Sequence, residues 1–596
     1  MRYPKLRVIQ SSRQMADNFA GYNHNLRIAD GELYDMKNMT SDSAPVLSPR
    51  KSRGLYAKTN TPTGLICKDA LCYTDGRDFV INHYHIDMGL SDEPKQLVSM
   101  GAYVIILPDK MWVNTANWDG SIFKVEGGFG NIEAWVETEG TVTFTLCMID
   151  GADYHIRFEA TDSEPKAKTE ENPDGAVNGD MYIDTSSKPH VLKQYSESAG
   201  MWVTVPTTYV KISYPGIGDH FERYDGINIE GLADTEAASL EGTAVVWEKG
   251  EDYIVVVGIL DEVLELDTTI CFSRKMPAMD FVIESENRLW GCKYGSANNG
   301  EVVNEIYASK LGDFKNWNCF MGLSTDSYAA SCGTDGQFTG AITHMGYPLF
   351  WKEGFLHKIY GNYPANFQIQ TTASRGVQKG CDKSLAIVNE TLFYKARSGI
   401  MAYDGSLPTE VSYALGDMAY GQAVGGAVGN KYYVSMQEAI GDIWDVFVYD
   451  MGKAMWHRED NFRADRFCAC DGELYAIDHD TGNIITMHGT GAAYEGDVEW
   501  MVETGEIGIS SPDMKYISRL TLRMSMDIGA SLRMLVKYDF SDVWEQVCEL
   551  TGTSLRSFSV PVRPKRCDHM KLRIEGMGMA KIYSITKTIE QGSELS

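Results

Sequence analysis

A short histidine-rich stretch is the first place where residue types and spacing could do chemistry. The sequence HYHID places His83 and His85 two residues apart, and Asp87 follows at the same interval. On a β-strand these residues would share one face, where imidazole and carboxylate groups can ligate a metal ion. No further ligand is marked by spacing, and exposed histidines at a sheet edge are the simpler interpretation. We therefore predict no metal site.

Three other stretches resemble known sites, but each lacks a residue that the site needs. DHDTGN at 478–483 resembles the start of a calcium loop, yet Gly489 stands at the position of the bidentate acid. SESAGMW at 196–202 resembles the Asp-box of sialidase-like propellers, but Ser198 takes the acidic position. The glycine-rich stretch at 421–430 lacks the Lys-Ser/Thr ending of a phosphate loop, so we expect close-packed backbone there.

The remaining catalytic signatures are also missing from the sequence. It contains no GxSxG elbow and no distinctive Cys–His arrangement. Acidic residues are so numerous that spacing cannot select a pair as general acid and base. The sequence therefore predicts no catalytic residue, no cofactor and no enzymatic activity.

Composition restricts the class of protein further. The chain has 596 residues, of which 43% are hydrophobic and 23% charged, as in folded globular proteins. Its 54 basic and 82 acidic residues give a formal charge of −28, which argues against a nucleic-acid-binding surface. The 12 cysteines include no CxxC pair, so we expect buried reduced thiols and no zinc ribbon.

No stretch of the sequence predicts membrane insertion or export. The longest apolar run, YIVVVGIL at 253–260, is too short to span a bilayer. The opening MRYPKLRVIQ lacks the apolar region of a signal peptide. We expect a protein that folds in a cytoplasm.

The second half of the chain repeats a strand–turn–strand unit. The units begin at Leu349, Leu392, Lys431 and Glu473, an interval of about forty residues that is typical of β-propeller blades. Further hairpins such as VFVYDMGKAMWHRED lie between them, so that each blade would have four strands. Two more blades are predicted before residue 125.

The sequence therefore predicts an all-β protein that contains a β-propeller of about seven blades. After residue 490 the period changes, and Leu520, Leu522, Met524 and Met526 alternate with polar residues as in a half-exposed strand. The predicted domains are an extended basic N-terminal arm (1–59), a first propeller segment (60–125), an inserted β domain (126–269), a second propeller segment (270–490) and a C-terminal β-sandwich (491–596).

Three stretches carry a resemblance to a known family. GLSTDSYAASCGTDGQFTGAITHMGYPLFWKEGFLHKIYGNYPANFQIQ (322–370) and KSLAIVNETLFYKARSGIMAYDGSLPTEVS (383–412) resemble the propeller-bearing structural proteins of tailed bacteriophages, of the tail nozzle or tail stabilisation type. The opening from NFAGYNHNL to LSPRKSRG (18–54) is similar to the start of the same group.

The resemblance implies a structural component of the virion tail, forming a nozzle, hub or stabilisation ring. Such a protein would assemble in the host bacterial cytoplasm with other tail or neck proteins. We expect a homo-oligomer, with six-fold symmetry, that forms a collar or tube. DNA would pass through it as cargo without specific binding, since acidic walls repel phosphates.

The basic N-terminal segment has two interpretations. Arg50, Lys51 and Arg53 lie close together in a chain that is strongly acidic overall. In the first interpretation they contact an acidic neighbouring subunit through charge-assisted hydrogen bonds. In the second, the arm packs on its own propeller and closes the last blade.

Host-surface glycan recognition is the alternative function. Propellers and β-sandwiches suit glycan binding, and the inserted domain contains Tyr182, Tyr195 and Trp202, which we predict as exposed glycan contacts. A polysaccharide-degrading propeller enzyme is a third possibility, although no carboxylate pair can be chosen for it.

Overall fold

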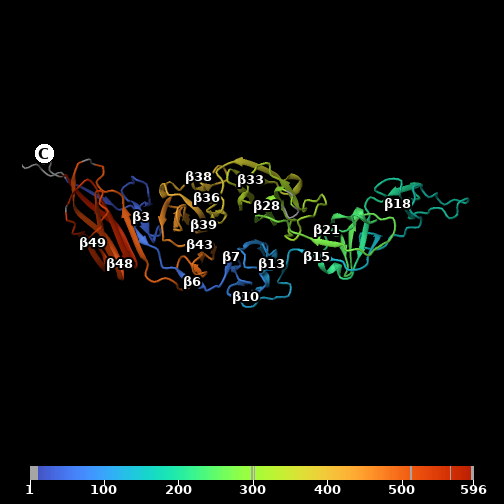
Figure 1. Cartoon of the computed structure of the whole chain (residues 1–596), viewed down its shortest axis with the longest axis horizontal. Helices are drawn as coiled ribbons and strands as arrows, with labels where there is room; N and C mark the ends of the chain where they lie inside the picture. The colour runs from blue at the N-terminus through green and yellow to red at the C-terminus, as the bar shows by residue number, and fades with distance from the viewer. Residues whose placement is uncertain (1–10, 297–299, 301, 511–512, 564, 592–596) are drawn as a thin grey trace, which may run out of the picture.

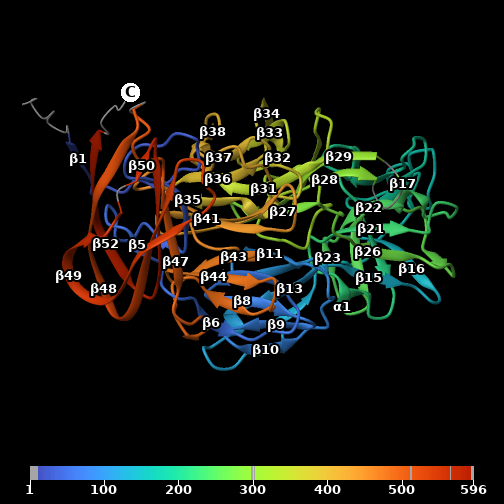
Figure 2. The same cartoon turned by 60° about the vertical axis from the view of Figure 1, so that its left-hand side comes forward.

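The computed structural model describes residues 11–296, 300, 302–510, 513–563 and 565–591 (Figure 1). The molecule is elongated: a C-terminal sheet lies at one end, the inserted segment at the other, and a group of smaller sheets between them (Figures 1 and 2). Strands dominate throughout, which confirms the all-β prediction. Among the described residues the one α-helix is α1 (Ile217–His220), and none is long and apolar enough to cross a membrane.

The central region contains seven antiparallel sheets; each of the first six is built from four strands in chain order, and the seventh also includes a strand from near the start of the chain. The first two sheets comprise β7 (Pro62–Lys68), β8 (Ala70–Asp75), β9 (Asp78–Ile81) and β10 (Tyr84–Asp87), then β11 (Gln96–Met100), β12 (Tyr103–Leu107), β13 (Met111–Asn114) and β14 (Phe129–Asn131). The strand β14 lies beyond the predicted boundary at 125, so the second sheet reaches further than the sequence pattern indicated.

The third to sixth sheets follow the inserted segment. They comprise β27 (Phe281–Ser285), β28 (Arg288–Ser296), β29 (Val302–Ala308) and β30 (Tyr328–Ser331); β31 (Phe338–His344), β32 (Tyr347–Lys352), β33 (Phe355–Tyr360) and β34 (Gln368–Ala373); β35 (Ala386–Val388), β36 (Thr391–Ala396), β37 (Gly399–Tyr403) and β38 (Thr409–Glu410); and β39 (Tyr420–Val428), β40 (Lys431–Glu438), β41 (Trp444–Asp450) and β42 (Met455–Arg458). Four of the predicted units therefore correspond to real sheets, because β32, β36 and β40 lie at three of the predicted starts and β44 (Glu473–Asp478), of the seventh sheet, lies at the fourth.

The seventh sheet contains a strand from the beginning of the chain. Its members are β43 (Ala464–Cys470), β44 (Glu473–Asp478), β45 (Ile484–Thr486), β6 (Gly54–Ala57) and β46 (Ala492–Ala493). The strand β6 pairs antiparallel with β45, so that Leu55 faces Ile485 and Gly54 faces Thr486. The start of the chain thus completes the last of the seven sheets.

The first strands of the seven sheets are neighbours in chain order. β7 lies beside β11, β11 beside β27, and β27 beside β31. β31 meets the fifth sheet through the short helix η4 (Asp382–Ser384), β35 lies beside β39, and β39 beside β43. The series returns to its start, because β43 also lies beside β7.

Glycines let these strands approach closely, as the sequence predicted for 421–430. A Cβ on Gly425 would lie 2.6 Å from the carbonyl oxygen of Ser384, and one on Gly426 would lie 2.4 Å from Cβ of Phe467. Both glycines belong to β39, whose neighbours on either side are η4 and β43. A side chain at either position would push adjacent sheets apart.

The C-terminal region forms one connected nine-stranded sheet that includes N-terminal strands. Its members are β1 (Ser11–Ala16), β2 (Gly21–Tyr22), β3 (Glu32–Lys37), β47 (Glu499–Thr504), β48 (Lys515–Tyr538), β49 (Glu545–Val560), β50 (Arg566–Cys567), β51 (Met570–Met577) and β52 (Ala580–Gln591). In β48, Leu520, Leu522, Met524 and Met526 are buried on one face, which confirms the predicted alternation.

The prediction of an extended arm at 1–59 is wrong for the residues that the structure describes. The strand β1 pairs with β52, β3 pairs with β47, and β6 belongs to the seventh sheet. Between β3 and β6 in sequence, β4 (Met39–Thr40) and β5 (Ser48–Pro49) form a small antiparallel pair. These strands are short and contain few apolar residues, so no local sequence pattern predicted them. Their partners lie at the other end of the chain.

The inserted segment forms three sheets of its own. They comprise β15 (Ala134–Glu137), β26 (Cys271–Arg274), β21 (Gly226–Glu230) and β22 (Gly242–Val245); β23 (Glu248–Lys249), β24 (Tyr253–Val257), β20 (Tyr209–Ser213), β16 (Val142–Cys147) and β25 (Leu264–Leu266); and β17 (Met181–Asp184), β18 (Val191–Ser196) and β19 (Met201–Thr204). Buried residues such as Phe144, Phe221 and Phe272 form a core within this segment.

A single large core joins the fourth, fifth and sixth sheets to the C-terminal sheet. It contains Trp351 and Tyr432 from the fourth and sixth sheets, Leu33 from β3, and Trp500 and Leu522 from the C-terminal sheet. The N-terminal strands therefore lie between the two regions and contribute to a continuous apolar interior.

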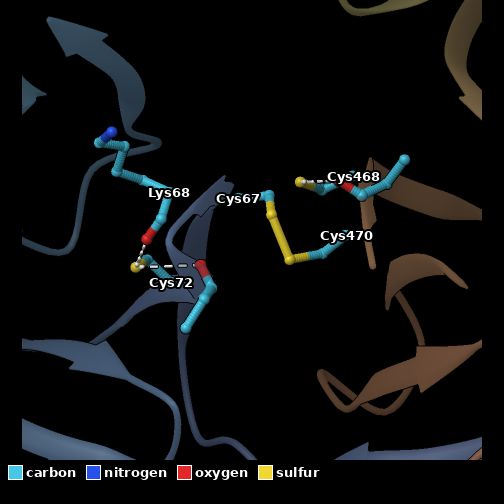
Figure 3. Close-up of a disulfide and its surroundings, with 7 residues drawn as sticks. Cys67, Lys68, Cys72, Cys468 and Cys470 are labelled. Atoms are coloured by element: carbon cyan, nitrogen blue, oxygen red, sulfur yellow. Dashed lines mark hydrogen bonds between the residues drawn. A yellow bond between two sulfur atoms is a disulfide. The ribbon is translucent and has the colours of Figure 1, made fainter. Parts of the chain in front are cut away.

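A disulfide joins the first and seventh sheets (Figure 3). It links Cys67 at the end of β7 to Cys470 at the end of β43, 403 residues apart in sequence. The expectation of reduced thiols is wrong for this pair, because sequence spacing cannot show that the two strands are neighbours. Ten other cysteines in the described residues are free, and most of them are buried.

Candidate functional site: an ionic junction beside the seventh sheet

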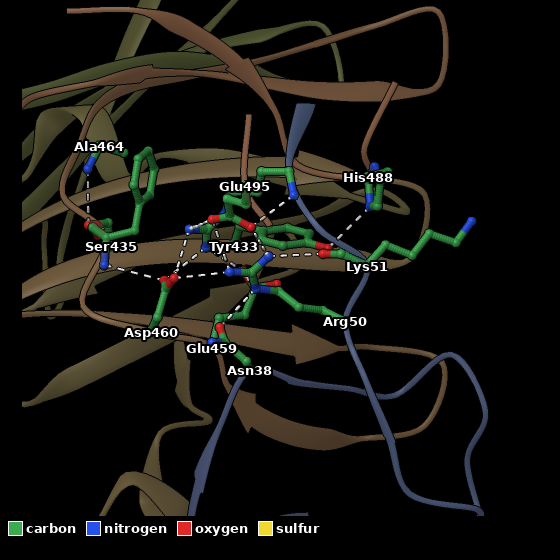
Figure 4. Close-up of polar contacts among 12 residues, drawn as sticks. Asn38, Arg50, Lys51, Tyr433, Ser435, Glu459, Asp460, Ala464, His488 and Glu495 are labelled. Carbon is green, nitrogen blue, oxygen red and sulfur yellow. Dashed lines mark hydrogen bonds and ion pairs between the residues drawn. The ribbon is translucent and has the colours of Figure 1, made fainter. Parts of the chain in front are cut away.

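Arg50 and Arg53 lie where the N-terminal segment passes from the C-terminal sheet to the seventh sheet. Figure 4 shows Arg50 beside Glu459, Asp460 and Glu495. Both arginine side chains are almost fully buried, with 6% and 2% exposed. They meet three acidic side chains from two other segments, which are Glu459 and Asp460 after β42, and Glu495 after β46.

Each guanidinium contacts more than one carboxylate. Arg53 lies 2.8 Å from Glu459 and 2.9 Å from Asp460, while Arg50 lies 2.7 Å from Glu495 and 3.0 Å from Asp460. Because Asp460 and Glu495 accept hydrogen bonds from both arginines, the five side chains form one network. Networks of this kind place guanidinium and carboxylate groups in fixed relative positions.

Neighbouring groups complete the coordination of the two arginines. Nε of Arg50 donates to Oδ1 of Asn38 at 2.9 Å, and its Nη1 donates to the carbonyl oxygen of Lys51. The guanidinium of Arg53 lies 4.6 Å from the centre of the Phe462 ring. The backbone N–H of Arg53 donates to Glu495 at 2.9 Å, so the main chain is held as well as the side chain.

The pKa shifts of Arg53, Asp460 and Glu495 favour their charged forms. Burial alone would lower the pKa of Arg53, but Asp460, Glu459 and Glu495 raise it. Burial acts to raise the pKa of Asp460, yet Arg53 and Arg50 lower it to about 2. The pKa of Glu495 is also lowered, since hydrogen bonding to Arg50 and the charge of Arg53 outweigh burial.

The geometry corrects the first interpretation of the basic segment. Arg50 and Arg53 contact their own chain from the interior, where a neighbouring subunit cannot reach their side chains. Lys51 alone of the three is exposed, and its role in a subunit contact stays a prediction. The second interpretation, an arm packed on its own sheets, agrees with the position of β6 in the seventh sheet.

The three aromatic residues predicted as glycan contacts form a small core instead. Tyr182 and Trp202 are buried and Tyr195 is half-buried. The Trp202 ring lies 4.7 Å from Tyr182 and 5.3 Å from Tyr195, measured between ring centres, and its Nε1 donates to the carbonyl oxygen of Pro165. A three-stranded sheet has few residues with which to build an interior, so large aromatic side chains fill it.

The histidine stretch is not arranged as a metal site. His83 lies in the turn before β10 with φ of 68°, and its ring stacks on Tyr56 at 4.3 Å. His85 lies on the strand, with Nδ1 3.0 Å from Asp78. Within the described ranges, no group of three or more His, Cys, Asp or Glu side chains could hold a metal ion.

The calcium-like stretch at 478–483 is a polar turn. Asp478 accepts hydrogen bonds from the Thr481 and Tyr494 hydroxyls at 2.7 and 2.5 Å, and from the backbone N–H of Asp480. These donors occupy the carboxylate oxygens that a cation would need.

Two hydrogen bonds join sheets that are not neighbours in the series, which sequence analysis did not predict. Nζ of Lys383, before the fifth sheet, donates to the carbonyl oxygen of Asp465 in the seventh at 3.2 Å. Nη2 of Arg466, in the seventh, donates to the carbonyl oxygen of Lys95, before the second, at 3.1 Å. Burial lowers the pKa of both Lys383 and Arg466. These links tie the fifth sheet to the seventh and the seventh to the second.

Comparison with known proteins gives no family. No family model matches the chain, and no curated protein matches it. Among solved structures, an exo-β-1,3-galactanase from Phanerochaete chrysosporium is 10% identical, with a TM-score of 0.21 over 51% of this chain and 94% of that one. A putative exported protein from Bacteroides fragilis is 9% identical, with a TM-score of 0.23 over 36% of this chain and 78% of that one. A glycoside hydrolase family 43 arabinoxylan arabinofuranohydrolase from Bacillus subtilis is 8% identical, with a TM-score of 0.18 over 52% and 96%. At these scores the likeness carries no conclusion about fold or activity.

Proposed function

We propose that the chain is a structural component of a phage virion tail, a nozzle, hub or stabilisation ring, whose copies form an oligomeric collar for DNA. The ionic junction is the observation that carries the proposal. It ties the start of the chain, the seventh sheet and the entry to the C-terminal sheet through five buried or half-buried charges. A component that must transmit force needs such fixed geometry between its regions.

We also infer that the seven sheets form a closed seven-bladed β-propeller and that the C-terminal sheet folds as a β-sandwich. The contact between β43 and β7, the pairing of β6 with β45 and the Cys67–Cys470 disulfide all support closure. A β-propeller leaves only short, protected sheet edges, which suits a component that must not aggregate.

In this proposal DNA passes between copies of the chain and not along the propeller axis. The hydrogen bonds from Lys383 to Asp465 and from Arg466 to Lys95 join sheets that are not neighbours, which supports a propeller centre filled by side chains. A channel for DNA must therefore be enclosed by several subunits, as in a cyclic oligomer. With a net charge of −28, the walls of that channel would repel phosphates and let DNA slide.

The aromatic side chains that suggested glycan recognition are not available on the surface as that alternative requires. Tyr182 and Trp202 are buried in the inserted segment, and Tyr195 packs against them. No other observation favours it over the structural function, so we do not propose it.

Electron microscopy of the purified full-length protein tests the proposed function. We expect closed rings with a central opening, and no retention of duplex DNA in a mobility-shift assay at low salt, where electrostatic binding is strongest. Single copies at every concentration, together with glycan binding or turnover of a polysaccharide, would contradict the proposal. Rings that bind DNA tightly would contradict the proposal that DNA slides past acidic walls without binding.

A further inference from the structure

Three loops beside the fifth and sixth sheets carry an exposed apolar patch, which we call the apolar rim. The loops span 23–28, 411–419 and 439–443. The His24 N–H donates to the carbonyl oxygen of Ala414 at 2.8 Å, and the Ala439 N–H donates to that of Ala419 at 2.8 Å, so the loops lie side by side. Neighbouring exposed apolar side chains of this kind mark sites where another protein binds. The rim consists of five side chains that are 44–92% exposed, namely Leu26, Tyr413, Met418, Ile440 and Ile443.

The apolar rim borders a cleft of about 310 Å³. Tyr413 and Met418 of the rim line this cleft, together with three buried side chains, which are Ile400, Tyr420 and Met436. Pockets that bind ligands have volumes from about 300 Å³ upward. The cleft can therefore receive side chains from a partner.

A buried lysine in the lining of the cleft has no opposite charge beside it. Lys395 of β36 is 2% exposed, and its Nζ donates to Oε1 of Gln378 at 2.8 Å and to the carbonyl oxygen of Ala396 at 2.6 Å. Among the residues that the structure describes, no carboxylate forms an ion pair with it. Burial lowers the pKa of Lys395, and the charge of Glu410 opposes this shift only in part.

The other charged residues that line the cleft are paired or exposed to water. Glu410 pairs with Arg375 at 3.1 Å, and Arg397 pairs with Glu353 at 3.2 Å. Asp417 is exposed, so its repulsion of another acidic group is screened by salt. Because a buried cation without a counter-charge is costly, the cleft favours a partner that brings a carboxylate between apolar side chains.

The turn between β48 and β49 has this chemistry, and we call residues 539–544 the hairpin tip. Phe540 is 89% exposed and Val543 is 66% exposed, although the Phe540 ring lies 5.4 Å from that of His569. Between them, the side chain of Asp542 is fully exposed and lies 3.6 Å from Nζ of Lys537. Ion pairs in water contribute little, so Asp542 is available to another cation.

We propose that the hairpin tip of one copy of this chain binds in the cleft of a second copy. Asp542 then pairs with Lys395, and Phe540 and Val543 contact the apolar rim. The contact joins two different surfaces, so it repeats from copy to copy and gives either a closed ring or an open filament. It supplies the contact between copies that the proposed collar requires, and its closure into a ring rests on the proposed function.

A mixing experiment with the full-length protein tests this contact by sedimentation equilibrium. We expect the mass of wild type to rise with concentration. A tip variant, Phe540→Ser/Asp542→Lys, and a rim variant, Tyr413→Asp/Ile440→Asp, should each remain single copies. Their equimolar mixture should form dimers and nothing larger, because it retains one intact tip and one intact cleft in each pair of copies.

The matched control for the tip variant changes the same residue types at other exposed positions. Ile528→Ser/Glu171→Lys alters an exposed apolar residue of β48 and an exposed acid of the inserted segment, and it should associate like wild type. All four positions of the tip and rim variants are exposed, so these changes should leave the fold intact.

A double-mutant cycle tests the ion pair itself. Lys395→Met and Asp542→Asn should each weaken association about tenfold, because each removes one partner of the same pair. The double variant should associate no more weakly than either single variant. Thermal unfolding checks that Lys395→Met folds, and the mixing experiment does not depend on that variant.

Several outcomes would overturn the inference. They are wild type that stays single at every concentration, a mixture of tip and rim variants that forms no dimer, and losses that add together in the double variant. Rings that persist in both surface variants would overturn this contact and leave the proposed collar standing. Association through tip and cleft into open filaments would support the contact and contradict the collar.

Discussion

The two connections of the central sheets differ in how they are made. Toward the C-terminal sheet, the connection uses shared strands, a continuous core and the charges around Arg50 and Arg53. Toward the inserted segment, the chain enters through β15 and leaves through its partner β26, and Asn316 of the central region donates a hydrogen bond at 2.8 Å to Asp225, which also pairs with Arg274 of β26. The inserted segment keeps its own sheets and its own cores.

The difference shows which regions of the molecule depend on distant residues. The junction joins residues about 400 positions apart, such as Arg53 with Glu459, so it can form only when both ends of the chain have met. The inserted segment is built from contacts among its own residues. We therefore expect changes at the junction to cost far more stability than changes at the base of the inserted segment.

The largest effect is expected for Arg53→Ala. Removing this buried cation leaves Glu459, Asp460 and Glu495 close together with Arg50 as their only partner in the described network. Breaking a buried ion pair by removing one partner costs about 3–5 kcal/mol. Denaturant unfolding should show a loss of this size, whereas Lys51→Ala, at an exposed neighbouring position, should change stability by less than about 0.5 kcal/mol. Equal losses for both variants would contradict a special role for the junction.

Loss of the disulfide should have the next largest effect. The Cys67–Cys470 bond closes a loop that contains most of the chain. Removing such a crosslink typically lowers the free energy of unfolding by about 2–4 kcal/mol. Cys470→Ser should lower the midpoint of thermal unfolding, and reducing agent should lower that of wild type to the same value. Cys468→Ser, two residues away at a free thiol, is the control and should behave like wild type. A reductant that changes nothing would show that the bond does not contribute.

Low pH should reduce the stability that Asp460 contributes to the junction, over a defined pH range. Burial raises the pKa of Asp460, but Arg53 and Arg50 lower it to about 2 from an ordinary value of 3.8. Because the folded-state pKa is below the unfolded one, this stabilisation is complete above about pH 5 and is lost as pH falls toward 2, a change of about 2 kcal/mol. The difference in unfolding free energy between wild type and Asp460→Asn should shrink across this window. A constant difference would mean that Asp460 is not held ionised by the arginines.

Local patterns were readable from the sequence at several places. The alternation of Leu520, Leu522, Met524 and Met526 predicted one buried face of β48, because a strand repeats every two residues. The repeats at Leu349, Leu392, Lys431 and Glu473 predicted four hairpins that the structure contains. Each of these patterns depends only on residues close in sequence.

Long-range partners were not readable in the same way. Nothing near Arg50 and Arg53 indicates that Glu459, Asp460 and Glu495 will meet them, although the acidic pair that ends WHRED was a possible signal. Trp202 was predicted as an exposed glycan contact, yet it is 7% exposed. In both cases the missing information was the position of another segment, which a local pattern does not contain.

The smallest effect is expected for removal of the inserted segment. Glu137 of β15 faces Cys271 of β26, so the chain ends left by deleting 138–270 are adjacent and a short glycine-containing turn can join them. The deletion removes Asp225 and leaves buried Arg274 and Asn316 without one of their partners, which should cost about 1–3 kcal/mol. Adding Arg274→Met should recover some of this loss, since an apolar side chain needs no partner there. A deletion that unfolds the central sheets would show that the inserted segment belongs to the same cooperative unit, and the contrast between the two connections would then be wrong.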